Sequence, residues 1–244
     1  MSIFPLVNFN ITCPMDHILL PSTIEFKDTD NPKIGILVLS PCHQGYGTTL
    51  GNALRRVLLS SIPGAAVEAV KIDGVDHEFS AIPGTLEDVV QVILNLKQLA
   101  VILHTDGPIK LSLKKKGVGD VTAADFETNA DVQIINPELK IATITDAKIP
   151  FGIEVIIGKG MGYVTAAEKS SKNLDLGTML MDSFYSAVRD VGYDVENTRV
   201  GDITDYEKLV VTIETNGTIT PREAVNQATE ILMKHFTSIL ETTK

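Results

Sequence analysis

Apolar residues recur at helical spacing across residues 48–61, and they divide the predicted helix into two unlike faces. At about 100° per residue, one stripe collects the side chains expected to be buried, namely Leu50, Leu54, Val57, Leu58 and Ser61. The opposite side carries Asn52, Arg55, Arg56 and Leu59. A solvated face would not need the leucine, and a core would not accept two adjacent arginines. Because arginine offers a rigid fork to acidic and carbonyl groups, this second face predicts a contact with a protein partner.

Strand-like runs lie on both sides of this helix. Residues 22–26 and 34–39 are rich in β-branched and apolar residues, and the turn cluster at 27–32 predicts that they pair antiparallel. Near the other end of the chain, residues 193–196 and 208–215 are also predicted to form strands.

The middle of the chain is predicted to be mostly β-structure. Alternation in residues 66–72 and 75–79, around an Asp-Gly pair, predicts a tight hairpin. Thr85, with Asp88 three residues later, is expected to cap the helix that follows. Residues 99–156 then contain short strands and turns.

The last helix has the clearest start signal of the chain. Thr220, Pro221 and Glu223 combine an N-cap, a proline at the first helical position and a capping-box acid. Its broad apolar side consists of Val225, Ala228, Leu232, Phe236, Ile239 and Leu240. This face is able to pack on its own domain or on a second copy of the chain.

Composition narrows the class of protein. The chain of 244 residues is 44% hydrophobic and 21% charged, as in globular proteins, and its net charge of -10 argues against nucleic-acid binding by the chain alone. Cys13 and Cys42 lack metal-type spacing, which favours reduced thiols. Without a signal peptide or a long apolar run, a soluble cytoplasmic protein is expected.

Candidate chemistry is weak throughout. The glycines and lysine of residues 158–162 invite a phosphate-binding loop, and hence a nucleotide-binding enzyme, but no helix is predicted after them and a glycine-rich turn is favoured. Asp73 and Asp76 flank a turn, and the basic run at 114–116 is typical of a solvated turn. The five histidines are scattered. No catalytic residue, metal or cofactor is therefore predicted. A short echo relates residues 117–125 to 160–168, and two similar corners are the favoured interpretation.

Long stretches of the chain resemble the amino-terminal domain of the bacterial RNA polymerase alpha subunit. The run Thr-Leu-Gly-Asn-Ala-Leu-Arg-Arg at residues 49–56 is the most specific match. Further matches keep the family's order along the chain, at residues 62–67, 72–79, 94–97, 119–125, 160–164 and 214–219.

This resemblance implies an α+β fold with two subdomains. Residues 1–63 and 190–244 would form a discontinuous dimerisation subdomain, an antiparallel sheet plus two helices. Residues 64–189 would form an inserted, mostly-β subdomain. The resemblance further implies a non-catalytic assembly subunit of DNA-directed RNA polymerase, a nucleotidyltransferase only as a complex. The homodimer would scaffold the beta and beta-prime subunits and reach DNA only through the assembled enzyme, away from membranes.

The resemblance also assigns contact residues. Arg56 matches the main beta-subunit contact, and Asn52, Arg55, Leu59 and Lys97 match neighbouring positions. The dimer interface would include Tyr46, Leu50, Leu232, Phe236 and Ile239. Two departures stand out. The chain ends at Lys244, without the carboxyl-terminal DNA-binding domain of typical alpha subunits, and residues 168–176 are short and polar where beta-prime contacts are expected.

Overall fold

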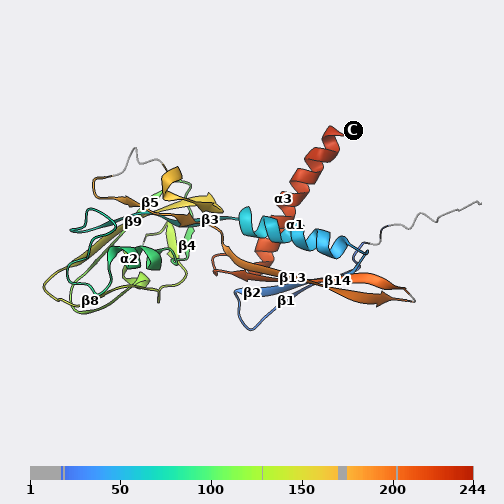
Figure 1. The fold of residues 1–244 in the computed structure, drawn as a ribbon, viewed down its shortest axis with the longest axis horizontal. Coiled ribbons are helices and arrows are strands. Elements are labelled where there is room, and N and C mark those ends of the chain that lie inside the picture. The colour runs from blue at the N-terminus through green and yellow to red at the C-terminus, as the bar shows by residue number, and fades with distance from the viewer. Residues whose placement is uncertain (1–17, 19, 128, 170–174, 202, 244) are drawn as a thin grey trace, which may run out of the picture.

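The computed structural model describes residues 18, 20–127, 129–169, 175–201 and 203–243. They form an elongated molecule with two packed units, each built around its own hydrophobic cluster (Figure 1). One cluster takes its buried residues from 37–62 and 187–228, and the other from 67–181. The class is α+β with mostly antiparallel sheets and three α-helices in the described residues, as predicted.

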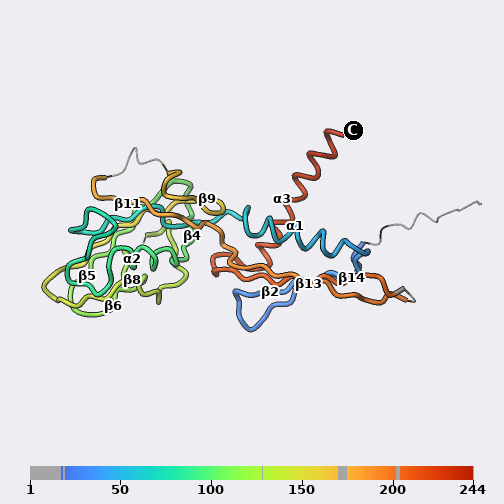
Figure 2. The backbone as a smooth tube through the Cα atoms, in the orientation of Figure 1, coloured from blue at the N-terminus to red at the C-terminus, as the bar shows by residue number. Residues whose placement is uncertain are grey.

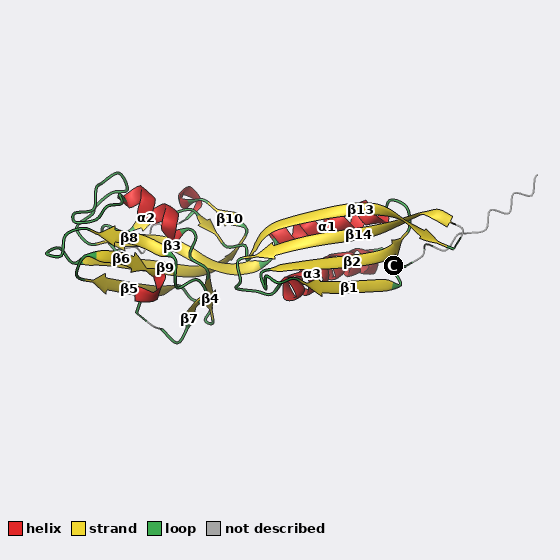
Figure 3. Cartoon of the chain, turned by 90° about the horizontal axis from the view of Figure 1, so that it is seen from below, coloured by secondary structure: helices red, strands yellow, loops and turns green. Residues whose placement is uncertain are grey.

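The first unit is a four-stranded antiparallel sheet covered on one face by two helices (Figure 3). Its strands, in spatial order, are β1 (Thr23–Asp28), β2 (Ile34–Cys42), β14 (Ile203–Thr215) and β13 (Val188–Val200). The helices are α1 (Tyr46–Ser60) and α3 (Pro221–Thr242). Alternate strand residues such as Leu37, Val211 and Ile213 are buried beneath them, as expected for a sheet with one covered face. The predicted pairing of β1 with β2 is confirmed.

Helix α1 approaches the sheet through glycine. A Cβ built on Gly51 would lie 2.7 Å from the Tyr193 ring, and one on Gly47 would lie 2.9 Å from Val195. Of the predicted stripe, Leu58 is fully buried, whereas Leu50, Leu54 and Val57 are half-buried on the flanks. The helix begins at Tyr46, two residues earlier than predicted.

The second unit is a curved, mostly-β structure. Its main sheet has the order β5-β9-β3-β4-β7, with β11 pairing on β3, and two further two-stranded ribbons, β6–β8 and β10–β12, lie beside it. The strands are β3 (Pro63–Ile72), β4 (Val101–Leu103), β5 (Ile109–Lys115), β6 (Gly119–Thr122), β7 (Val132–Ile134), β8 (Lys140–Ile144), β9 (Phe151–Met161), β10 (Tyr163–Val164), β11 (Met179–Leu180) and β12 (Ser183–Phe184). Helix α2 (Val89–Leu96) packs against β8.

The predicted hairpin around Asp73-Gly74 is wrong. Strand β3 pairs with β9 and β4, not with residues 75–79. The Asp73 amide donates to the carbonyl of Gly152 on β9, so the chain turns across the end of the sheet. Val75 then enters the core, while residues 76–79 are exposed. The alternating pattern of residues 75–79 therefore places one side chain, Val75, in the core and does not form a strand.

The predicted cap of the next helix is also wrong by one turn. The Asp88 carboxylate accepts the Gln91 amide at 2.8 Å and caps α2. The Thr85 hydroxyl instead donates to the carbonyls of Ile82 and Glu87. Residue 86 is tied to β8 through the Thr143 carbonyl, which delays the helix.

The sequence echo corresponds to two similar corners, as interpreted from the sequence. Strand β6 leads through Thr122 into the 3₁₀ turn η1 (Ala123–Asp125), and β10 leads through Thr165 into η2 (Ala166–Glu168). In the first corner the Asp125 carboxylate accepts the Thr122 amide at 2.9 Å. The second corner lacks a side-chain cap.

Candidate subunit-contact site

Glu207, on strand β14 of the sheet beneath α1, fixes the start of this helix. Its two carboxylate oxygens accept the backbone amides of Gly45 and Gly47, each at 2.8 Å. A carboxylate at a helix N-terminus satisfies unpaired amides and faces the positive end of the helix dipole. Burial raises the pKa of the nearby Cys42 thiol, and the Glu207 charge adds to this. The position of α1 is therefore set by a residue about 160 positions away in the chain.

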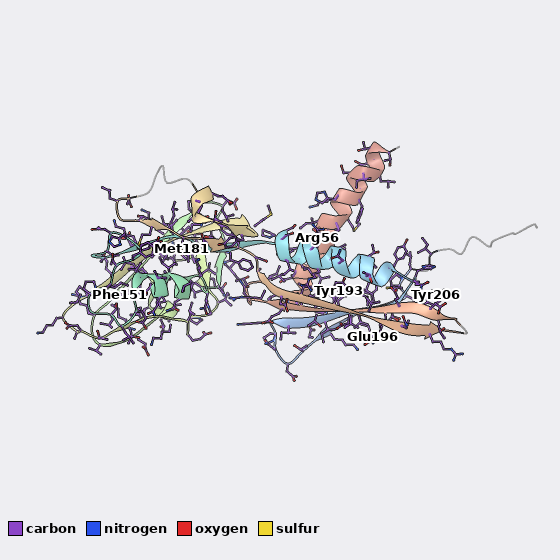
Figure 4. All side chains as sticks on the ribbon, viewed as in Figure 1. Arg56, Phe151, Met181, Tyr193, Glu196 and Tyr206 are labelled. Carbon is purple, nitrogen blue, oxygen red and sulfur yellow. The ribbon has the colours of Figure 1, made fainter. Side chains whose placement is uncertain are left out.

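The polar face of α1 is open. Asn52, Arg55 and Arg56 are exposed, and within the part of the chain that the structure describes neither guanidinium has a hydrogen-bond or ion-pair partner. Figure 4 shows Arg56 on the α1 ribbon above the sheet, whereas Tyr193 lies between α1 and the strands. Leu59 is half-buried and packs partly on the core of the first unit, so less of it is available than its position on the polar face suggested.

Lys97 follows α2 in the second unit and belongs to a small polar cluster. Its ammonium pairs with the Asp182 carboxylate at 3.1 Å, and the other oxygen of that carboxylate accepts the Ala166 amide at 2.9 Å. The Ala166 hydrogen bond, and then Lys97, hold the pKa of Asp182 below its usual range.

This cluster adjoins the end of α1. Gly162, next to Tyr163 in sequence, sits against α1, since a Cβ built on it would lie 3.4 Å from the carbonyl oxygen of Ser60. The ribbon β10–β12 thus lies between the predicted contact residues of the two units, with Gly162 against Ser60 of α1 at one end and Asp182, the partner of Lys97, at the other.

The residues predicted for the dimer interface lie in two places. Tyr46 is exposed at the start of α1 and contacts His43 edge-on, with ring centroids 6.0 Å apart, and Leu50 is half-buried one turn later. Leu232 is half-buried on α3, whereas Phe236 is 63% and Ile239 60% exposed. The second half of α3 extends away from both units (Figure 1).

The start of α3 confirms its predicted cap. The Thr220 hydroxyl accepts the Glu223 amide at 3.3 Å, and the Glu223 carboxylate accepts the Thr220 amide at 3.1 Å. Near this first turn the Arg222 guanidinium lies 4.7 Å from the centre of the Phe26 ring, which ties the base of the helix to β1.

The glycine-rich segment does not form a phosphate-binding loop. Residues 158–161 lie within strand β9, and residue 162 leads into β10 instead of a helix. A Cβ on Gly158 would overlap the Glu68 carboxylate, and one on Gly160 would lie 2.8 Å from the Tyr185 ring. These glycines make room for neighbouring side chains, and the carboxylate beside them would repel a phosphate.

Other candidate chemistry is equally sparse. In the described ranges, no three His, Cys, Asp or Glu residues are grouped so as to hold a metal ion. Cys42 is buried, and Cys13 lies outside the described residues. Lys115 of the basic run pairs with Asp125 at 2.6 Å. No helix among the described residues combines the length and apolar character needed to span a bilayer.

Sequence reasoning missed the residues that support the site. Glu207, Asp182, Gly47 and Gly51 act on partners distant in the chain, so periodicity along one segment does not reveal them. The only local signal was the pair of glycines four residues apart on α1, which suits close helix packing.

Comparisons with known proteins agree with this arrangement. Residues 70–186 match the model of the RNA polymerase Rpb3/RpoA insert domain. The DNA-directed RNA polymerase subunit alpha of Symbiobacterium thermophilum is 49% identical over 210 residues, covering 86% of this chain and 66% of that protein. Those of Clostridium botulinum and Alkaliphilus metalliredigens are 46% and 45% identical, with 66% and 68% of their lengths covered. The chain thus spans slightly less than two thirds of the first two relatives. It belongs to the family of DNA-directed RNA polymerase alpha subunits.

Proposed function

We propose that the chain is a non-catalytic assembly subunit of DNA-directed RNA polymerase. Two copies associate, and the dimer holds the beta and beta-prime subunits, which carry out nucleotidyl transfer and contact DNA in the assembled enzyme. The main support is the open arginine face of α1, where Arg55 and Arg56 have no partner among the described residues although Glu207 and two glycines fix the helix below them. The proposed place of action is the cytoplasm.

In this proposal residues 1–63 and 190–244 form the dimerisation subdomain and 64–189 the inserted subdomain. The two separate hydrophobic clusters support this division. The dimer forms through Tyr46, Leu50, Leu232, Phe236 and Ile239. Phe236 and Ile239 are supported by the apolar surface left open along the second half of α3, since apolar area of this kind is usually covered by a partner.

The beta-subunit contact consists of Asn52, Arg55, Arg56, Leu59 and Lys97. Arg56 carries most of the contact energy in this proposal, because its position matches the main beta contact of the family and its planar guanidinium is able to form two parallel hydrogen bonds with one carboxylate.

The test is capture of the purified beta subunit by the dimer. Arg56→Ala is expected to leave a folded dimer and to weaken capture by about 2 kcal/mol, or about 30-fold, as for a buried hot-spot residue. Arg55→Ala, one residue away and also exposed, is the matched comparison and should weaken capture less. Lys148→Ala, on an exposed turn of the second unit, should cost nothing. Undiminished capture by Arg56→Ala would refute the assignment of this face.

A further inference from the structure

The two units are joined by two chain connections that touch each other. Residues 61–64 lead from α1 into β3, and residues 185–188 lead from β12 back into β13 (Figure 2). Gly64 lies so close to the second connection that a Cβ on it would overlap the carbonyl oxygen of Tyr185. Because the two connections lie side by side, they form a single hinge axis between the units. Rotation of one unit against the other about this axis is the motion that the backbone resists least.

Tyr185 fixes the second of these connections to the second unit. It belongs to the second connection, is only 4% exposed, and its ring lies over Gly160 of β9. Its hydroxyl donates to the Glu68 carboxylate of β3 at 2.7 Å. The connection is therefore anchored on two strands of the second unit by one side chain.

Lys169 adds a second anchor from the segment after β10. Its ammonium donates to the Met181 carbonyl at 2.6 Å, to the Glu68 carbonyl at 3.4 Å and to the Ser183 hydroxyl. Ser183 in turn donates to the Val67 carbonyl of β3. Lys169 thus ties the segment that carries Tyr163 to the same strand that anchors Tyr185.

A chemical role for this group is excluded by access. Ser183 beside Lys169 resembles a nucleophile with its base, but Ser183 is 1% exposed and its hydrogen is engaged by a backbone carbonyl. A substrate cannot reach the hydroxyl, so the group acts on the arrangement of the chain.

We propose that Glu68, Lys169, Ser183 and Tyr185, the junction network, are positioning residues that hold the Arg56 and Lys97 contacts at a fixed spacing. Both contacts can then engage one large subunit at once, and the second contact gains affinity because the first already holds it in place. This binding consequence rests on the proposed function. The rigidity of the junction does not, and it is tested separately.

The first experiment measures the distance distribution between spin labels on the two units of one purified chain. Labels are attached through ketone-bearing amino acids at positions 27 and 148, exposed in different units. We expect Tyr185→Phe combined with Lys169→Met to broaden the distribution between the labels at least twofold. Tyr193→Phe is the matched control, because it also removes one tyrosine hydroxyl but lies on the sheet under α1. An unchanged width in the double variant overturns the proposal.

The second experiment measures beta-subunit capture in two backgrounds. In the otherwise native chain, Tyr185→Phe with Lys169→Met should weaken capture by about tenfold through lost preorganisation. In the Arg56→Ala background, where the α1 contact has lost its main residue, the same pair should weaken capture by much less than tenfold. Equal weakening in both backgrounds would indicate general destabilisation and would overturn the positioning role. Failure of the native dimer to capture beta would refute the proposed function, while the label distances would still decide whether the junction is rigid.

Discussion

The two units use helices α2 and α3 in opposite ways. Helix α2 buries Val89, Val92, Ile93 and Leu96 in the core of its own unit. Helix α3 buries only Pro221, Ala224 and Ala228 near its start. Val225 and Leu232 are half-buried, and Met233, Phe236, Ile239 and Leu240 further along the helix are exposed. Helix α2 thus contributes to the core of its own unit, whereas the second half of α3 leaves apolar side chains uncovered, which the proposed dimer would bury.

The largest effect should come from the open half of α3. Phe236→Ala with Ile239→Ala should raise the dimer dissociation constant at least about 100-fold, because each buried apolar side chain contributes about 1.5–3 kcal/mol. Sedimentation equilibrium measures this constant. Phe79→Ala is the matched control, since Phe79 is 81% exposed but lies in the second unit. The difference between the units would be refuted if the α3 changes left the dissociation constant unchanged. It would also be refuted if Phe79→Ala raised that constant as much.

The next effect concerns how α1 rests on its sheet. Gly51→Ala should lower the free energy of unfolding by about 1–3 kcal/mol, because its Cβ would press on Tyr193 in a packed site. Gly192→Ala on β13 is the control, since nothing lies within 4 Å of its added Cβ. Urea unfolding followed by circular dichroism compares them, and equal midpoints would mean that α1 is not held by close packing.

A smaller effect is expected from the helix anchor. Glu207→Ala should destabilise the first unit by about 1 kcal/mol, in the range of lost N-caps, and Glu207→Gln by less because one acceptor remains. Hydrogen exchange at the Gly45 and Gly47 amides should rise in the alanine variant. Exchange in β9 of the second unit serves as the internal reference and should stay constant.

The smallest effect is a pH dependence in the second unit. The pKa of Asp182 is lowered by the Ala166 amide and Lys97, so its stabilisation is present above the unfolded-state pKa of about 3.9. It is lost as the pH falls through the lower folded-state value. Asp182→Asn should therefore flatten the acid side of the stability curve, measured by denaturant midpoints from about pH 6 downward. A curve with unchanged slope would contradict this role.

Much of the fold was predictable where signals are local. The Thr220 capping box, the β1–β2 pair and the α1 helix follow from short-range chemistry that the rest of the chain does not override. The hairpin predicted between residues 66–72 and 75–79 was wrong because alternation does not show which strand a segment pairs with. Strand β3 pairs instead with β9, about 80 residues further along the chain.

The candidate site divides in the same way. Arg55 and Arg56 were visible because two arginines on one helix face contradict a core. The groups that hold this face in place were not visible, because Glu207 and Asp182 act across long sequence separations. The half-burial of Leu59 also depends on tertiary packing, which periodicity does not specify.

The projection of α3 makes it a lever arm. Its 22 residues span roughly 33 Å at 1.5 Å per residue, so a tilt of about 10° at the base would move the tip by about 6 Å. A displacement of that size exceeds the reach of any side-chain contact at the far end. The position of the helix end is therefore set at the base of α3. There Thr220, Glu223 and the Arg222–Phe26 stack fix the direction in which the helix leaves the sheet.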